Sequence, residues 1–341
     1  MKLRISAKPA AFSACAAMTA RVFCALAVDE PSAHSAAWLS ALIGAALSIP
    51  ALIALHAASR RAAGGKLAAA AFLCASLANC RCALREIVQS AECLALDRAP
   101  SFALLLPAAL ALLWCVTRNG DAVGYSAMLW FRSFPALLVV VFLLQLPVYR
   151  PEWLRITMLG SGWPTVVGNG IRSAGWIVST AAIWLVRDVE GPSGDGVRPI
   201  LTACAAAAGI VTGMIALRVM VTPALKPGAS ASWQLRLDSL LTNGRSPLYL
   251  QFPMIVIWYV GLLHLLSCAG FAAAALAQRL FPSLDGKACA AIVALAAAFL
   301  SAAPRPDVQT ASLLSQWQYV ALAAAALPVA VKEVFPRCSG A

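Results

Sequence analysis

The sequence predicts an all-α integral membrane protein with about ten transmembrane helices, and three observations support this. Hydrophobic residues make up 61% of the 341 positions, whereas charged residues make up only 12%, against about 25% in a soluble domain. The mean hydropathy is +0.81. The apolar residues also gather into runs near the roughly 20 residues that a helix needs to cross a bilayer with its backbone groups hydrogen-bonded internally.

Windows of low charge, bounded by Gly, Pro and charged clusters, define ten expected spans. They cover residues 11–28, 36–58, 67–96, 101–116, 122–148, 166–186, 200–221, 248–277, 288–303 and 311–331. The connections between them are too short to hold a soluble domain. We therefore expect residues 1–341 to form a single integral membrane domain.

The distribution of basic residues predicts the orientation of the chain. Ten spans place both termini on one side of the membrane. If that side is the cytoplasm, the cytoplasmic segments carry thirteen Lys and Arg residues and the outer segments carry seven. The positive-inside rule thus favours a multi-pass protein with cytoplasmic termini. The net charge of +12 follows from these membrane edges, and without a basic arm or aromatic platform we expect no nucleic-acid partner.

Residues for catalysis are scarce. The chain has three histidines, at His34, His56 and His264, and no Ser/His/Asp, Cys/His or paired-carboxylate pattern accompanies them. No Cys/His set has the spacing of a zinc site. We therefore expect neither an enzyme nor a bound cofactor or metal ion.

Six arginines fall inside the expected spans, at Arg21, Arg81, Arg85, Arg132, Arg172 and Arg218. A charge at bilayer depth costs several kcal/mol unless it faces a cavity or a partner, so each is a candidate functional residue. Arg218 lies close enough to a span end to reach the interface with its head group. The position of Arg132 depends on where the fifth span begins.

Four polar residues form a stripe on the third span. Arg81, Arg85, Gln89 and Glu92 recur at intervals that place them on one helical face. This stripe, the polar seam, cannot face lipid. It is either a structural seam against a neighbouring helix or one wall of a polar cavity.

Arg21 and Arg172 occupy similar depths in the first and sixth spans, which begin the two halves of a five-plus-five chain. Gly168, Gly170 and Gly175 weaken the helix around Arg172. Transporters with inverted repeats hold ligands near the midplane at matching discontinuous helices. The expected fold is thus a five-plus-five inverted repeat with broken first and sixth helices.

The candidate ligand site consists of side chains and backbone around these two arginines. Its residues are Thr19, Arg21, Arg172, Ser173 and Gly175. A guanidinium in a dry cavity could bind a ligand carboxylate through two hydrogen bonds. The alternative is two unrelated structural arginines that bind backbone carbonyls or the carboxylates of Glu86 and Glu92.

Several stretches, in order along the chain, resemble one family. They are Ile5-Ser6, Ala37-Trp38-Leu39-Ser40-Ala41-Leu42-Ile43-Gly44, Leu84-Arg85-Glu86, Phe134-Pro135, Leu146-Pro147, Leu159-Gly160-Ser161-Gly162-Trp163, Trp258-Tyr259-Val260-Gly261, Ala272–Gln278 and Asp285-Gly286-Lys287. In this order the chain resembles the endospore germination permeases, the B subunits of germinant receptors, within the amino acid–polyamine–organocation superfamily. The resemblance covers nearly the whole length.

The resemblance implies a sensor in the inner membrane of the spore. A small-molecule germinant, often an amino acid, would bind where the first and sixth helices break, and the partner A and C subunits would respond to the bound shape. Two departures fall at this site. The first span reads Ala17-Met18-Thr19-Ala20-Arg21 where the family has glycines, and the sixth has Val178-Ser179-Thr180 where the family has a carboxylate.

Two other functions remain open at this point. One is an ordinary secondary amino-acid or amine transporter of the same superfamily. Only Glu86 and Glu92 supply carboxylates inside the expected spans, however, and ion-coupled transport usually uses such acids. The other is a diverged scaffold subunit that keeps the bundle for assembly and no longer binds a ligand, which the missing glycines favour.

Overall fold

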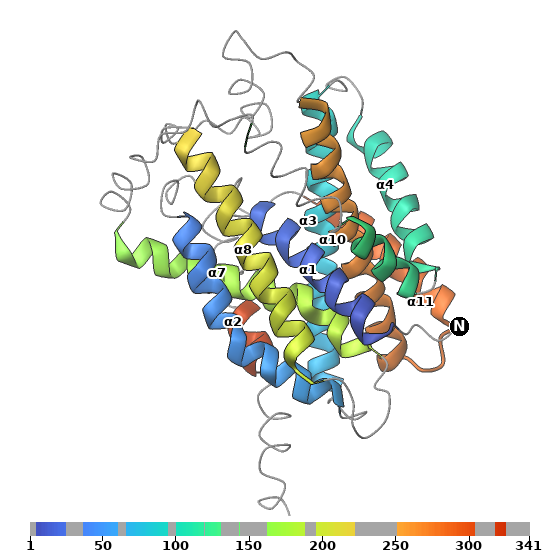
Figure 1. Cartoon of the computed structure of the whole chain (residues 1–341). Coiled ribbons are helices and arrows are strands. Elements are labelled where there is room, and N and C mark those ends of the chain that lie inside the picture. Colours follow the sequence, from blue (N-terminus) through green and yellow to red (C-terminus); the bar gives the residue numbers. More distant parts are fainter. Residues whose placement is uncertain are drawn as a thin grey trace, which may run out of the picture.

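The computed structural model describes residues 5–24, 37–60, 66–94, 100–118, 120–130, 143, 162–187, 196–221, 251–303 and 318–324. Within these residues the protein is helical, with no β-strand and a single isolated bridge between Ile5 and Arg187. Figure 1 shows the helices gathered into one bundle.

The helices begin and end close to the expected spans. Their bounds are α1 (Ala7–Cys24), α2 (Ala37–Arg60), α3 (Lys66–Leu94), α4 (Ser101–Val116), α7 (Trp163–Thr180), the 3₁₀-helix η4 (Ala181–Val186), α8 (Arg198–Val221), α10 (Gln251–Leu280) and α11 (Gly286–Ala302). A further helix covers Gly120–Trp130. The bounds of α4 match the fourth expected span. Most of the fifth and tenth expected spans lies outside the described residues.

Four of the described helices are long and apolar enough to cross a membrane. These segments are Trp38–Ser59, Lys66–Glu92, Arg198–Ala216 and Tyr259–Leu280. A fifth is added if Phe102–Val116 and Gly120–Trp130, which meet at a bend of 112°, count as one span. The structure is consistent with a helical membrane protein, with four or five candidate spans among the described residues.

Large apolar side chains project outward from these helices. On α4, Phe102, Leu106, Leu110 and Trp114 are exposed and recur every fourth residue, so they form one face. Ile292, Leu295 and Phe299 form a similar exposed face on α11. Faces of this kind are unfavourable in water and suit contact with lipid.

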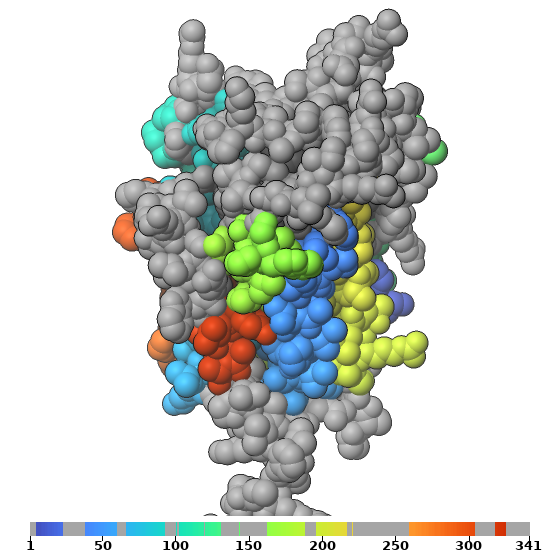
Figure 2. All heavy atoms as spheres, turned by 90° about the vertical axis from the view of Figure 1, so that its left-hand side faces the viewer, coloured from blue at the N-terminus to red at the C-terminus, as the bar shows by residue number. Residues whose placement is uncertain are grey.

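The described helices pack as two groups. The first group contains α1, α2, α7 with η4, and α8, because α2 contacts both α7 and α8, and α1 contacts α7 and α8. The second group contains α3, α4, α10 and α11, which contact one another in the same way. The two groups meet where α1 and η4 contact α10 and where α3 contacts α7. Figure 2 shows α2 between α8 and residues 318–324 on one face of the molecule.

Small residues allow the helices to approach closely. A Cβ atom at Gly44 of α2 would lie 2.4 Å from the Cβ of Ser173 and 2.9 Å from the backbone oxygen of Gly170 on α7. Packing through small residues is typical of membrane helices, where close van der Waals contact stabilises association. The α2–α7 contact therefore depends on glycine at position 44.

The helix breaks expected from the sequence do not fall where the glycines predict. The α-helix α7 continues through Gly168, Gly170 and Gly175, and it changes to the tighter 3₁₀ form only at Ala181. Helix α1 is continuous from Ala7 to Cys24, so no break falls within those residues. Gly170 contacts Ile43 of α2, where a Cβ atom would lie 2.5 Å from the Ile43 Cγ2. Its role is thus close packing and not helix interruption.

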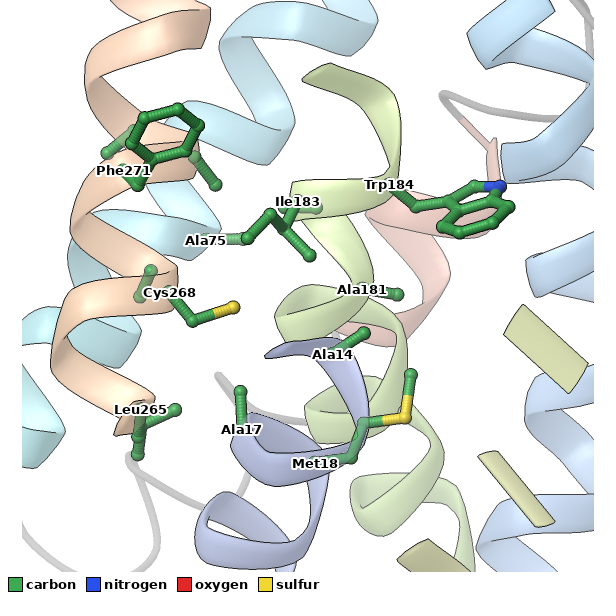
Figure 3. Packing of buried hydrophobic residues seen from close by; sticks show 14 of the residues in the cluster. Ala14, Ala17, Met18, Ala75, Ala181, Ile183, Trp184, Leu265, Cys268 and Phe271 are labelled. Carbon is green, nitrogen blue, oxygen red and sulfur yellow. The ribbon is translucent and has the colours of Figure 1, made fainter. Parts of the chain in front are cut away.

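The buried core lies between the two groups. Figure 3 shows side chains from α1, α10 and η4 around a shared interior, with Ile183 of η4 directed toward Ala75 of α3. Trp184, the next residue, is directed away from this interior and is fully buried. Many of the core residues are Ala, and small side chains at helix contacts keep the helices close together.

Candidate functional site

Arg21 lies near the end of α1, at the junction of the two helix groups. Its Nε donates a hydrogen bond to Oδ1 of Asn79 on α3, at 3.2 Å. Its guanidinium carbon lies 5.0 Å from the centre of the Trp176 ring on α7. A guanidinium at this distance from an indole is stabilised by cation–π attraction. Arg21 is thus held between one helix of each group.

Asn79 joins α3 to α7. It is 1% exposed, and its Nδ2 donates to the Oγ of Ser179 at 3.1 Å. Ser179 in turn donates to the backbone oxygen of Trp176 at 2.9 Å. We call Arg21, Asn79, Trp176 and Ser179 the Arg21 cluster. Its hydrogen bonds connect α1, α3 and α7 through buried polar atoms. A buried network of this kind stabilises the fold most when every polar atom in it has a hydrogen-bond partner.

Two donors of the Arg21 cluster have no hydrogen-bond partner among the described residues. These are Nη1 of Arg21 and Nε1 of Trp176, and both atoms are buried. Each can only donate, and a buried donor without an acceptor costs about 1–3 kcal/mol. The cluster can therefore accept an oxygen-bearing group, and a carboxylate matches the positive charge of Arg21.

Arg172 lies four residues before Trp176 on α7, so the two side chains share one helical face. Arg172 is half-buried, and its Nη1 donates to Oδ1 of Asn169 at 3.2 Å. Because Arg21 lies against Trp176, the structure places both candidate arginines on the Trp176 face of α7.

The other candidate ligand residues have different surroundings. Thr19 donates to the backbone oxygen of Cys15 at 2.8 Å, and its position two residues before Arg21 turns it toward another face of α1. Ser173 donates to the backbone oxygen of Asn169 at 2.9 Å and packs against Gly44 of α2. Gly175 is buried within α7. The hydroxyls of Thr19 and Ser173 are thus bonded within their own helices.

The polar seam contains a structural contact between helices. Arg81, Arg85, Gln89 and Glu92 are all half-buried. Arg85 donates from Nε to the backbone oxygen of Ser301 at 3.0 Å, and from Nη2 to that of Ala303 at 2.6 Å. These carbonyls lie at the end of α11, where they have no partner within the helix, so Arg85 satisfies the α11 C-terminus.

A second buried polar group joins η4 to α2. Trp184 donates from Nε1 to Nδ1 of His56 at 3.2 Å, and Arg187 Nη1 lies 3.4 Å from the same nitrogen. The guanidinium carbon of Arg187 lies 4.1 Å from the centre of the Trp184 ring. Arg187 is one of the thirteen basic residues that the expected topology places in cytoplasmic segments, yet its side chain is only 4% exposed. Its stacking on Trp184 accounts for this burial.

Sequence reasoning missed Asn79, Trp176 and Ser179 as members of the site. Trp176 and Ser179 follow Arg172 at intervals of four and seven residues, which places all three on one face of α7. For Asn79 the sequence carries only a weaker indication of a functional role, namely a single amide side chain within a mostly apolar span. Which helices meet at this face depends on packing, so one sequence alone does not pair Arg21 with Asn79.

Among known proteins, no family model matches the chain, and no curated protein matches it.

Proposed function

We propose that this protein is a membrane sensor, a permease-like subunit of a germinant receptor, that binds a small carboxylate-bearing molecule at the Arg21 cluster. An amino acid is the proposed ligand class, and the receptor's A and C subunits are the proposed partners. The observation that carries the proposal is the position of Arg21 at the junction of the two helix groups, where its buried Nη1 has no hydrogen-bond partner among the described residues.

The helix contacts support the inverted-repeat part of this proposal. Four pairs of helices that hold corresponding places in the two halves of the chain contact each other: α1 with α7, α2 with α8, α3 with α10, and α4 with α11. A five-plus-five repeat with a pseudo-two-fold axis would produce contacts of this kind. The Arg21 cluster uses the first of these pairs together with α3.

The location of the cluster supports a signalling role. Arg21 and Trp176 belong to the first helix group, whereas Asn79 belongs to the second. A ligand that binds all three would stabilise one relative position of the groups over another. Such differential binding is the requirement for a ligand to shift a conformational equilibrium.

One alternative function has an observation in its favour, namely a scaffold subunit without a ligand. Helix α1 is continuous over Ala7–Cys24, and the hydroxyls of Thr19 and Ser173 are bonded within their helices. In this alternative, Arg21 only holds α1 against α3 and α7 through its contacts with Asn79 and Trp176. The experiment below separates the two functions because only a sensor responds to a ligand.

The test is ligand-induced stabilisation of the purified full-length protein in detergent. A panel of the common amino acids, each also as its amide without a free carboxylate, is screened for a rise in thermal unfolding temperature. We expect stabilisation by at least one amino acid and not by its amide. Arg21→Gln should abolish the shift, whereas Arg118→Gln, an exposed arginine that stacks on Trp114, should keep it. Absence of any shift over the whole panel favours the scaffold.

A second measurement addresses the transporter reading. The protein is reconstituted into liposomes with an imposed proton or sodium gradient and a radiolabelled form of the stabilising amino acid. We expect no accumulation above the equilibrium level. If the gradient drives accumulation and Arg21→Gln abolishes it, the protein is a transporter and not a sensor.

A further inference from the structure

A groove lies between α1 and α8. Its volume is about 480 Å³, and its walls come from the first half of each helix. The lining on α8 extends from Arg198 to Ala206, a length of about 12 Å at about 1.5 Å per residue. Helices α1 and α8 both begin at the lower side of the bundle in Figure 1.

The groove has an apolar interior and a cationic end. Of the ten described residues that line it, seven are apolar, among them Ala11, Phe12 and Ala203. Lys8 and Arg198, which lie at the first turns of α1 and α8, line the groove at that end and are exposed. Neither side chain forms a hydrogen bond or ion pair with another of the described residues.

The charges of the groove distinguish between possible occupants. Among the described residues that line it there is no Asp or Glu, so the ammonium group of an amino acid would have no carboxylate partner among them. Two cations at one end match a phosphate group, and the apolar walls match a hydrocarbon chain. Both cations belong to segments that the positive-inside rule assigns to the cytoplasmic side, where anionic lipids are concentrated.

We propose that this groove binds an anionic phospholipid of the cytoplasmic leaflet. Its phosphate lies between Lys8 and Arg198, and part of one acyl chain lies along Ala11 and Ala203. Because α1 also carries Arg21, an occupied groove would fix α1 against α8 at the end of the helix opposite to the Arg21 cluster. The binding site does not require the proposed function, since the Arg21 cluster shares no residue with it.

The charge part of the proposal is tested on the purified full-length protein by native mass spectrometry. The probes are phosphatidylglycerol and phosphatidylcholine with identical acyl chains, and the readout is the affinity of the first retained lipid. We expect phosphatidylglycerol to bind more tightly. Lys8→Gln with Arg198→Gln should weaken it by about fivefold for each cation, or about 25-fold for the pair.

The matched control is Lys66→Gln with Lys287→Gln, which removes two exposed cations from the same expected side but outside the groove. We expect less than about a twofold change, because these cations lie away from the headgroup. Equal affinity of the wild type for the two lipids would overturn the proposal. An equal loss in the control pair would also overturn it, since general surface charge would then explain the binding.

The groove part is tested by two substitutions of neighbouring exposed alanines on α8. Ala206 lines the groove and Ala205 does not. Ala206→Phe should lower the affinity for phosphatidylglycerol several-fold while Ala205→Phe leaves it unchanged. Displacement of phosphatidylglycerol by inorganic phosphate, or a change in oligomeric state with Ala206→Phe in place of a lost lipid, would contradict a lipid occupant.

Discussion

Asn79 is the residue that links the two helix groups at the Arg21 cluster. Its side-chain oxygen accepts from Arg21, and its side-chain nitrogen donates to Ser179. An amide is suited to this place because it carries an acceptor and a donor on one short side chain. Truncation would leave the Arg21 Nε without its acceptor in a buried region, whereas the Ser179 hydroxyl would keep its bond to the backbone oxygen of Trp176.

We therefore expect Asn79→Ala to lower the free energy of unfolding by about 1–3 kcal/mol, the cost of leaving buried polar groups unpaired. The measurement is denaturant unfolding of the purified protein in detergent. Ser126→Ala is the control, because Ser126 is exposed and its loss should change the stability by less than about 0.5 kcal/mol. A neutral Asn79→Ala would show that these contacts add little to stability.

Arg172 provides a second prediction at the residue scale. Lysine keeps the positive charge at position 172 but lacks the planar, forked donors that bind a carboxylate through two bonds. Arg172→Lys should thus leave the protein assembled and lower its sensitivity to a carboxylate ligand by about tenfold, or about 1.4 kcal/mol. The ligand dose that gives half-maximal thermal stabilisation measures this change. An unchanged dose would remove Arg172 from the site.

At the scale of elements, the fold depends on close contact between α2 and α7. Gly44 lies where the two helices approach closely, and Ser173 and Gly170 occupy the space that a side chain would need. The contact also places α7, and with it Trp176, beside α1. A shift of α7 away from α2 would therefore change the geometry of the Arg21 cluster.

Gly44→Ala should destabilise the protein by about 1–3 kcal/mol, because the added methyl group forces the helices apart. Gly209→Ala on α8 is its matched control, since a Cβ atom there meets nothing within 4 Å. That substitution should be neutral or stabilise by up to about 1 kcal/mol through helix propensity. Thermal unfolding of both variants in one detergent measures the difference. Equal stability of the two would contradict the tight α2–α7 contact.

For the whole molecule, the distribution of Lys and Arg predicts the orientation in the membrane. Both termini are expected in the cytoplasm, which makes the connection at Ser32 external and the connection at Ser193 internal. The lipid site proposed at Lys8 and Arg198 assumes the same orientation. The positions Ser32 and Ser193 themselves lie outside the described residues.

Cysteine accessibility tests this orientation. Single cysteines replace Ser32 and Ser193 in a variant without the eleven native cysteines. A membrane-impermeant maleimide should label position 32 in intact cells and position 193 only after permeabilisation. The reverse pattern would place the termini outside and would also move the groove to the outer leaflet.

The sequence by itself determined that the protein is helical and suited to a membrane, because hydropathy and charge act locally along the chain. It also predicted the bounds of α4 and the approximate bounds of α2, α3, α8, α10 and α11. The similar depth of Arg21 and Arg172 in the membrane stays a prediction, and Arg21 lies in the last turn of α1. Gly168, Gly170 and Gly175, in contrast, predicted a weakened helix around Arg172, since low helix propensity is a local property, whereas α7 continues through all three.

Only the tertiary structure decided what these residues contact. Gly170 packs against α2 without breaking α7, and Arg85 binds the end of α11. Arg21 meets Asn79 and Trp176, whereas Thr19 bonds within α1. The physical reason is that helix contacts in a membrane depend on shape and hydrogen bonds between faces far apart in the chain. Periodicity assigns a residue to a face, and packing determines which helix that face meets.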